Sequence, residues 1–420
     1  MYQKTTLPGG LRVITTAMPH LRSVSVCIFT GAGSRYEQDS EAGISHYIEH
    51  LLFRGTPKRP SSREISQAIE GVGGVLNAAT DKELTLYWTK VTQEHLTLAL
   101  DVLTDMFLHA KLETADIEKE RQVIIEEINM SLDSPSQRTE MLIDELLYPN
   151  HPLGRDIAGS KETVAGMNRE MMLGYLNRQY LPQNTVVSIA GNISHAHAVA
   201  EVEKLLGGWA STQKQAPYLA FQSNAGARLK TEKRDIEEVH LNLALPGLSL
   251  FHPQRFVLGL LNNILGSGMS SRLFLEVRDR LGLCYSIHSY VGHHLDAGSL
   301  VIGAGVEPKN LVALIQATTH ELARLKEKVP EWELEKAREI TKGHLILRLE
   351  DSRDTASWAG AQETLMGRIL TIDDVVRIID AITTEEVQKL AEELLVGEKL
   401  RLAAVGPVKE EDKLEELLRI

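Results

Sequence analysis

Two histidines and a glutamate lie close together in the stretch HYIEH, residues 46–50 of the 420-residue chain. If this stretch is helical, His46 and His50 lie about one turn apart on the same face and can both point at one metal ion. Glu49 leans off that axis, so its carboxylate reaches the open side of the ion rather than the ion itself. The spacing is therefore compatible with a metal centre that has a carboxylate beside it.

The neighbouring residues have the pattern of a helix that is buried on one side. Apolar or aromatic side chains recur at the i, i+3, i+4, i+7, i+8 spacing of an amphipathic helix, at Ile44, Tyr47, Ile48, Leu51 and Leu52. The pattern predicts a helix over 41–53 whose histidines face away from the core. The competing interpretation is a pair of histidines on a solvated face, since a five-residue pattern also arises by chance.

Two histidines do not complete a catalytic zinc site, which usually has three protein ligands and one open position. The stretch EKERQVIIEEINM (118–130) supplies carboxylates on a helix predicted over 114–132. Glu120 and Glu127 are seven residues apart, about two turns, so they share a face, whereas Glu126 points about 100° away from Glu127. We therefore expect Glu120 and Glu127 near the histidines, against the competing interpretation that they are solvated like most glutamates.

The elements that would position these residues occur twice along the chain. The first half predicts strands over 11–18, 23–33, 83–91 and 184–194, and helices over 41–53, 61–71, 93–110 and 114–132. Four stretches of the second half repeat this order, beginning at Glu238, Ser270, Leu334 and Leu400, at offsets of 209 to 217 residues. A shared offset near half the chain length indicates an internal duplication.

This duplication predicts two homologous α+β domains, each a mostly antiparallel sheet packed against helices. We expect an N-terminal metal-binding domain over 1–212, a linker over 213–230 and a C-terminal domain over 231–420. The second half lacks the ligands: HYIEH corresponds to LLNNI (260–264), and Glu120 and Glu127 correspond to Ala337 and His344. A metal is therefore expected in the first half alone.

The bulk composition narrows the class of protein. A net charge of -12 argues against a nucleic-acid partner. No run of about 18 apolar residues and no apolar signal segment occur, so we expect neither a membrane span nor secretion. Cys27 and Cys284 lie in apolar runs and are expected to be small buried hydrophobes in a reducing compartment. These features favour a cytoplasmic protein.

The combined motifs resemble a known family. HxxEH is the inverted zinc motif, and 76 residues separate His50 from Glu127. With this spacing the chain resembles the pitrilysin (insulinase) metallopeptidases, above all the mitochondrial-processing-peptidase branch and its compact bacterial relatives. The stretches that support the resemblance are GSRYE (33–37), HYIEHLLFRGT (46–56), NAATDKELTLYW (77–88), HPLGRDIAG (151–159) and GSGMSSRLFLEVRDRLGLCYSIHSY (266–290).

The resemblance implies roles for residues at matching positions in the first half. His46, His50 and Glu127 match the ligands of one Zn²⁺ per chain, and Glu49 matches the general base. Glu120 matches an acid that orients a ligating histidine. A second matching segment is the sheet edge on which a peptide lies as an added strand, formed by Asn77, Ala78, Ala79 and Thr80.

The second half of the chain is implied to contribute to substrate binding. Arg278 and Tyr285 match an arginine and a tyrosine that contact the substrate, and the tyrosine could donate to the oxyanion. Departures from the family's usual residues are mild: Ser45, Tyr47 and Cys284 replace Ala, Phe and a small residue. The adjacent His293 and His294 diverge on a strand, so we interpret them as surface residues rather than a second metal site.

The resemblance implies a zinc endopeptidase. Its substrates would be peptides or unfolded polypeptide segments, bound as an added β-strand in an enclosed chamber, and compact members of the family suggest a homodimer. Two alternatives stay open. One is a non-catalytic structural subunit on the same fold, as in the core proteins of respiratory complexes; the other is a metal-dependent hydrolase of another substrate class.

Overall fold

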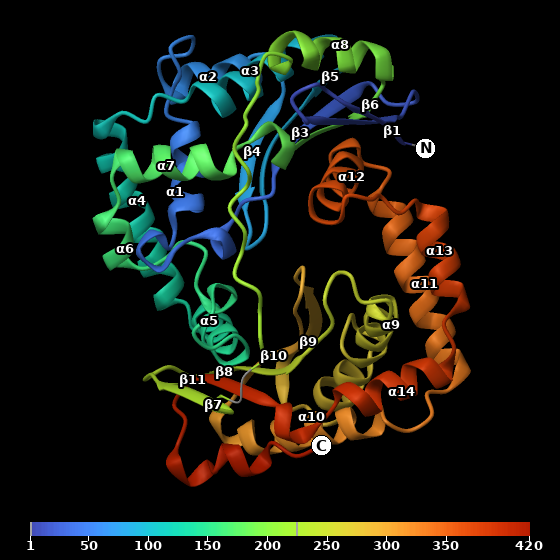
Figure 1. Ribbon diagram of the computed structural model, residues 1–420. Helices are drawn as coiled ribbons and strands as arrows, with labels where there is room; N and C mark the ends of the chain where they lie inside the picture. Colours follow the sequence, from blue (N-terminus) through green and yellow to red (C-terminus); the bar gives the residue numbers. More distant parts are fainter. Residues whose placement is uncertain (1, 224–225) are drawn as a thin grey trace. The chain divides into compact units, whose positions relative to one another are not determined.

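A computed structural model describes residues 2–223 and 226–420 of the chain (Figure 1). Met1 and, within the predicted linker, Asn224 and Ala225 lie outside the described residues. The chain divides into two compact units. Unit 1 comprises Met1–Ile128, Asp156–Leu219 and Ile346–Thr371, and unit 2 comprises Asn129–Arg155, Ala220–Leu345 and Ile372–Ile420.

Unit 1 is built around a six-stranded sheet with the order β1-β2-β6-β3-β5-β4. The β2–β6 pair is parallel, and the other four pairs are antiparallel. Buried and half-buried residues alternate along β5, so this strand has the two-residue period of a sheet with two different faces. The strands are β1 (Tyr2–Thr6), β2 (Arg12–Ala17), β3 (Ser23–Thr30), β4 (Val75–Thr80), β5 (Thr85–Thr92) and β6 (Thr185–Gly191).

Unit 2 contains a five-stranded sheet with the order β7-β11-β8-β10-β9. Its β7–β11 pair is parallel and the rest are antiparallel, which is the order of the first sheet without β1. Two mostly antiparallel sheets packed against helices confirm the predicted α+β class. The strands are β7 (Leu229–Lys233), β8 (Val239–Pro246), β9 (Cys284–His293), β10 (Gly298–Val306) and β11 (Arg401–Gly406).

Each unit also contains several helices. Those of unit 1 are α1 (Ile44–Leu52), α2 (Ser62–Glu70), α3 (Leu96–His109), most of α4 (Thr114–Asp133), α6 (Lys161–Gly166), α7 (Arg169–Gln179), α8 (His195–Leu206) and α12 (Ser352–Met366). Those of unit 2 are α5 (Pro135–Leu147), α9 (Arg255–Leu265), a π-helix (Phe274–Arg280), α10 (Leu311–Arg324), most of α11 (Glu331–Arg348), α13 (Ile372–Ala381) and α14 (Thr384–Leu394). Among the described residues, none of the helices has the length and apolar character that a membrane crossing requires.

One helix from each half of the chain packs on the sheet formed by the other half. The late helix α12 packs on β3 and β6 of unit 1, and the early helix α5 packs on β8 and β11 of unit 2 (Figure 1). Gly360 allows the close approach of α12, since a Cβ there would lie 2.3 Å from Phe29 Cε2. The compact units are therefore not continuous stretches of sequence.

Three sequence expectations need correction. Cys27 is buried as predicted, but Cys284 is only partly buried. His293 and His294 are partly buried rather than surface residues, and His293 Nδ1 lies 2.6 Å from the Leu248 carbonyl oxygen. The helix predicted over 41–53 begins at Ile44, because Gly43 before it has the left-handed φ of 97°.

Candidate metal centre

Helix α1 buries one face and turns its histidines away from the core. The side chains of the predicted apolar stripe are all less than 1% exposed, namely Ile44, Tyr47, Ile48, Leu51 and Leu52. The Tyr47 hydroxyl also donates a hydrogen bond to the Ile117 carbonyl oxygen, which ties α1 to the first turns of α4. Glu37 holds the start of α1 by accepting hydrogen bonds of 2.8 Å from the Gly43 and Ser45 amides.

Three potential ligand atoms from α1 and α4 form a small triangle. His46 Nε2 lies 3.3 Å from His50 Nε2 and 3.7 Å from Glu127 Oε2, and His50 Nε2 lies 3.6 Å from the same oxygen. Within the described residues, this is the group of three histidine, cysteine or acidic side chains whose ligand atoms converge closely enough to hold a metal ion. The geometry thus brings together the three residues expected to be ligands.

The chemistry of this triangle fits zinc. Tetrahedral ligands at zinc bond lengths of roughly 2.0–2.2 Å lie about 3.3–3.6 Å from one another, close to the three separations observed here. Burial, with a smaller contribution from the nearby charge of His50, lowers the pKa of His46 to about 4. His46 is therefore neutral at physiological pH, which is the form that binds a metal.

Glu120 contacts one of these ligands, His50, at the ring nitrogen that does not face the other two ligand atoms. Its Oε2 lies 2.9 Å from His50 Nδ1, and its carboxylate is almost completely buried. A hydrogen bond at Nδ1 leaves Nε2 as the ligating nitrogen and fixes the orientation of the ring. The other carboxylate oxygen, Oε1, forms an ion pair with Arg54, a residue that the sequence reasoning missed. No spacing within a segment indicates this contact, because α1 ends at Leu52 and the partner of Arg54 lies on α4.

Glu49 lies on α1 beside the ligands, and its carboxylate is anchored to the sheet. The Thr80 hydroxyl donates a hydrogen bond of 2.5 Å to Glu49 Oε2. Burial raises the pKa of Glu49, and the Thr80 hydrogen bond and the charge of His50 oppose that rise in part. A partly desolvated carboxylate with a raised pKa is suited to accept and return a proton near neutral pH.

The segment from Asn77 to Thr80 belongs to β4, the edge strand of the first sheet. Its one neighbour in the sheet order is β5, and helix α1 packs near it. Asn77 and Ala79 are exposed, whereas Ala78 and Thr80 are half-buried. Thr80 therefore differs from the other three residues, because its side chain holds Glu49 as well as lying on the strand.

Arg278 and Tyr285 lie together in unit 2. The Arg278 guanidinium is 5.5 Å from the centre of the Tyr285 ring and 4.4 Å from that of Phe274. In the β9–β10 ladder, Ser286 lies opposite Gly305 and Cys284 opposite Val306, so Tyr285 is the extra residue of a β-bulge. The bulge turns this side chain outward, and it is 82% exposed.

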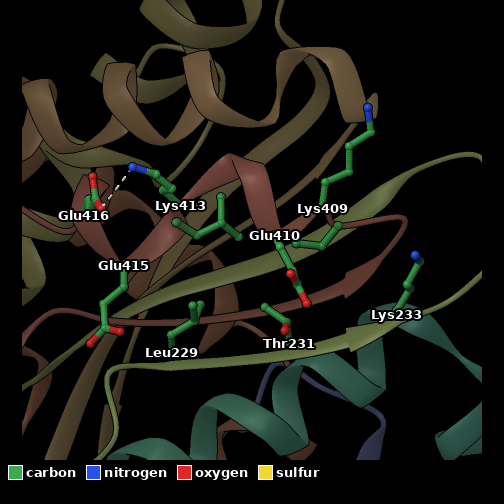
Figure 2. Close-up of a pocket in the computed structure, with 10 residues that line it drawn as sticks. Leu229, Thr231, Lys233, Lys409, Glu410, Lys413, Glu415 and Glu416 are labelled. Atoms are coloured by element: carbon green, nitrogen blue, oxygen red, sulfur yellow. Dashed lines mark ion pairs between the residues drawn. The ribbon is translucent and has the colours of Figure 1, made fainter.

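A separate pocket of about 540 Å³ lies in unit 2, beside β7 and the segment around 408–416 (Figure 2). Its charged side chains are those of a solvated surface: Lys413 pairs with Glu416 at 3.7 Å, and Lys409 pairs with Glu411 at 3.6 Å. The ten residues that line it include neither histidine nor cysteine. The pocket therefore lacks the histidine ligands found on α1.

Family models and curated relatives match most of the chain. The model of the insulinase family (peptidase family M16) matches residues 12–161, and the model of the peptidase M16 inactive domain matches residues 166–341. The uncharacterised zinc protease YmxG of Bacillus subtilis is 38% identical over 408 residues, covering 97% of this chain and 98% of its own length. An uncharacterised zinc protease of Mycobacterium leprae is 38% identical over 423 residues, covering 99% and 94%.

Solved structures share the fold at lower identity. A protease from Helicobacter pylori has a TM-score of 0.92 and 22% identity, covering 97% of this chain and 99% of its own. A chain of Complex III2 from Candida albicans, solved with Inz-5 bound, has a TM-score of 0.85 and 20% identity, and both chains are covered completely. The converging ligands lie inside the part matched by the insulinase model, and the inactive-domain model matches most of the half without them. The chain therefore belongs to the insulinase family of peptidases, peptidase family M16.

Proposed function

We propose that this protein is a zinc-dependent endopeptidase with one Zn²⁺ per chain, held by His46, His50 and Glu127. The observation that carries the proposal is the triangle of their ligand atoms, with sides of 3.3–3.7 Å, next to a carboxylate on the same helix. Relatives of similar length that are named zinc proteases support the same conclusion.

Two glutamates have separate roles in the proposed hydrolysis, one in proton transfer and one in orienting a ligand. When bound, zinc would lower the pKa of a water molecule toward 7 and polarise a peptide carbonyl. Glu49 takes the proton of the attacking water and later returns it to the leaving nitrogen. Its raised pKa favours that exchange near neutrality. Glu120 keeps the His50 ring in its ligating orientation through the contact at Nδ1.

The free edge of β4 supports an extended peptide as the substrate. Residues Asn77–Thr80 have β5 on one side, so main-chain groups on the other side can pair with an added strand. Such pairing reads an extended backbone and little side-chain sequence, which suits peptides and unfolded segments. Arg278 would bind the substrate backbone, and Tyr285 would donate to the carbonyl oxygen under attack. An enclosed chamber, a homodimer and a cytoplasmic location belong to the same proposal.

One observation favours a second candidate, a non-catalytic structural subunit. A chain of the Complex III2 structure has the same fold along its whole length. The complete set of ligands and the adjacent Glu49 favour the peptidase, because a purely structural role would not require them to converge.

The test combines activity with metal content. The purified chain is assayed on a library of internally quenched peptides, before and after removal of metal by a chelator and after zinc is added back. We expect cleavage that is lost on chelation and restored by zinc. Glu49→Gln should bind zinc normally and lose about 10²–10⁴-fold of the activity.

Two results would contradict the proposal. A protein that neither binds zinc nor cleaves any peptide would favour the structural subunit. A protein that binds zinc but cleaves no peptide would favour a hydrolase of another substrate class. Retention of full activity by Glu49→Gln would exclude the assigned general base while leaving the metal site intact.

A further inference from the structure

Arg54 lies just beyond the end of α1 and forms an ion pair with Glu120 Oε1, while Glu120 Oε2 contacts His50 Nδ1. We propose that Arg54 is a positioning residue of the metal centre: it holds the Glu120 carboxylate against His50 and so fixes the ring that presents Nε2 to the ion. This inference rests on the proposed zinc site and extends it by one residue.

The backbone turn at the end of α1 directs the Arg54 side chain towards α4. The Phe53 amide donates to the His50 carbonyl oxygen at 3.2 Å, and the Arg54 amide donates to that of Leu51 at 3.0 Å, so the last turn closes tightly. Gly55 then has a φ of 136°, and a Cβ at this position would lie 2.4 Å from the Pro60 carbonyl oxygen. A side chain at residue 55 would therefore force the turn open and move Arg54.

The turn after Arg54 is fixed to helix α3. The Thr56 hydroxyl and Arg59 Nη1 each donate to Asp105 Oδ2 at 2.7 Å. The Thr56 amide also donates to the Arg59 carbonyl oxygen at 2.8 Å, and Thr56 and Asp105 are both buried. Arg54 thus lies between a closed helix end and a hydrogen-bonded turn, and these contacts fix the position of its backbone.

Glu120 needs a partner of this kind. The residue is 2% exposed, and His50 occupies one of its carboxylate oxygens. A buried carboxylate oxygen without a partner is strongly destabilising, and the carboxylate could then rotate away from the ring. The Arg54 guanidinium pairs with Glu120 Oε1, and Glu120 Oε2 stays in contact with His50 Nδ1.

The Arg54 side chain is 33% exposed, so the alternative role is a direct contact with substrate. The two roles predict different measurements. A positioning residue changes the affinity for zinc in the absence of any peptide, and it acts through Glu120. A substrate contact changes KM and leaves zinc affinity alone.

The experiment measures zinc affinity of the full chain by competition with a chromophoric chelator, without substrate. Arg54→Met removes the charge and keeps much of the length, and we expect a 10–100-fold weaker affinity, the usual effect of losing a residue that supports a ligand. Arg54→Lys should recover part of the loss. The matched control is Lys58→Met, which removes another cation of the same segment, paired with Asp101 at 2.6 Å rather than with Glu120; its affinity should stay within twofold of wild type.

A double-mutant comparison tests the route of the effect. In a Glu120→Gln background, adding Arg54→Met should cost less than about twofold, because the carboxylate through which Arg54 acts is already gone. Equal losses with and without Glu120, or an Arg54→Met affinity within twofold of wild type, would overturn the inference while the zinc site stands. If the wild-type chain itself binds no zinc, the proposed function fails as well, so the two failures are distinguishable. Thermal unfolding of each variant without zinc identifies any that do not fold. If Arg54→Met does not fold, the zinc affinity of Arg54→Lys is compared with that of the wild type instead.

Discussion

Thr80 donates a hydrogen bond of 2.5 Å to Glu49, and this contact joins the edge strand β4 to the helix that carries the two histidines. A single side chain thus links the strand proposed to receive the peptide with the carboxylate proposed to activate water. A shift of β4, on which the peptide would align, would consequently also move the Glu49 carboxylate.

Thr80→Val should alter the pH dependence of peptide cleavage. The Thr80 hydrogen bond lowers the pKa of Glu49 against the stronger effect of burial, so its loss raises that pKa further. Glu49 must be deprotonated to accept a proton, so kcat/KM falls as the pH drops through its pKa. The acid limb of the kcat/KM profile should therefore move to higher pH, with zinc content unchanged. Thr92→Val, at the exposed end of β5, is the control, and an unshifted acid limb in Thr80→Val would contradict the expectation.

Glu127→Gln should abolish the stabilisation of the protein by zinc. A ligand that binds the folded state alone stabilises it by about 2.7 kcal/mol at a free concentration of 100 Kd. Thermal unfolding with and without zinc measures this gain in the wild type, and the variant should show almost none of it at the same concentration. Glu126→Gln is the neighbouring control and should keep the full shift. A zinc-dependent shift of wild-type size in Glu127→Gln would remove this residue from the ligand set.

Gly55→Ala should destabilise the chain and weaken zinc binding together. The φ of 136° and the contact with the Pro60 carbonyl oxygen both oppose a Cβ at this position, at a cost of about 1–3 kcal/mol. Gly166 has nothing within 4 Å of a Cβ and no positive φ, so Gly166→Ala should be neutral or slightly stabilising. Chemical denaturation of both variants gives the comparison, and a smaller loss for Gly55→Ala than for Gly166→Ala would contradict it.

The two cysteines should differ in their reaction with an alkylating agent. Burial raises the pKa of the Cys27 thiol to about 12 and that of Cys284 to about 11. The thiolate is the reactive form, so both react slowly at pH 8. Cys27 is completely buried and Cys284 partly exposed, so mass spectrometry of the native protein should find Cys284 modified first. Cys27 should react at a normal rate once the chain is unfolded, and early modification of Cys27 in the native state would be evidence against its burial.

The sequence was sufficient for the local features, because each depends on short-range geometry. The spacing of His46 and His50 places both on one helix face, and the apolar stripe from Ile44 to Leu52 predicts that the opposite face is buried. The repeat offset predicted two related sheets, and the two strand orders agree except for β1. Glu127 was found because two residues seven apart share a helix face and because the whole pattern resembled a known family.

The tertiary structure decided how separate elements meet. Whether Glu120 or Glu127 faces the histidine Nε2 atoms depends on the packing of α1 against α4, and both residues lie on the same face of their helix. The partnership of Arg54 with Glu120 and that of Thr80 with Glu49 cross from one element to another, so no periodicity within a segment could predict them. The packing of α5 and α12 on the two sheets likewise joins residues more than 90 positions apart. A sequence pattern reports which face a residue occupies, and the packing of that face against another element determines which atom it touches.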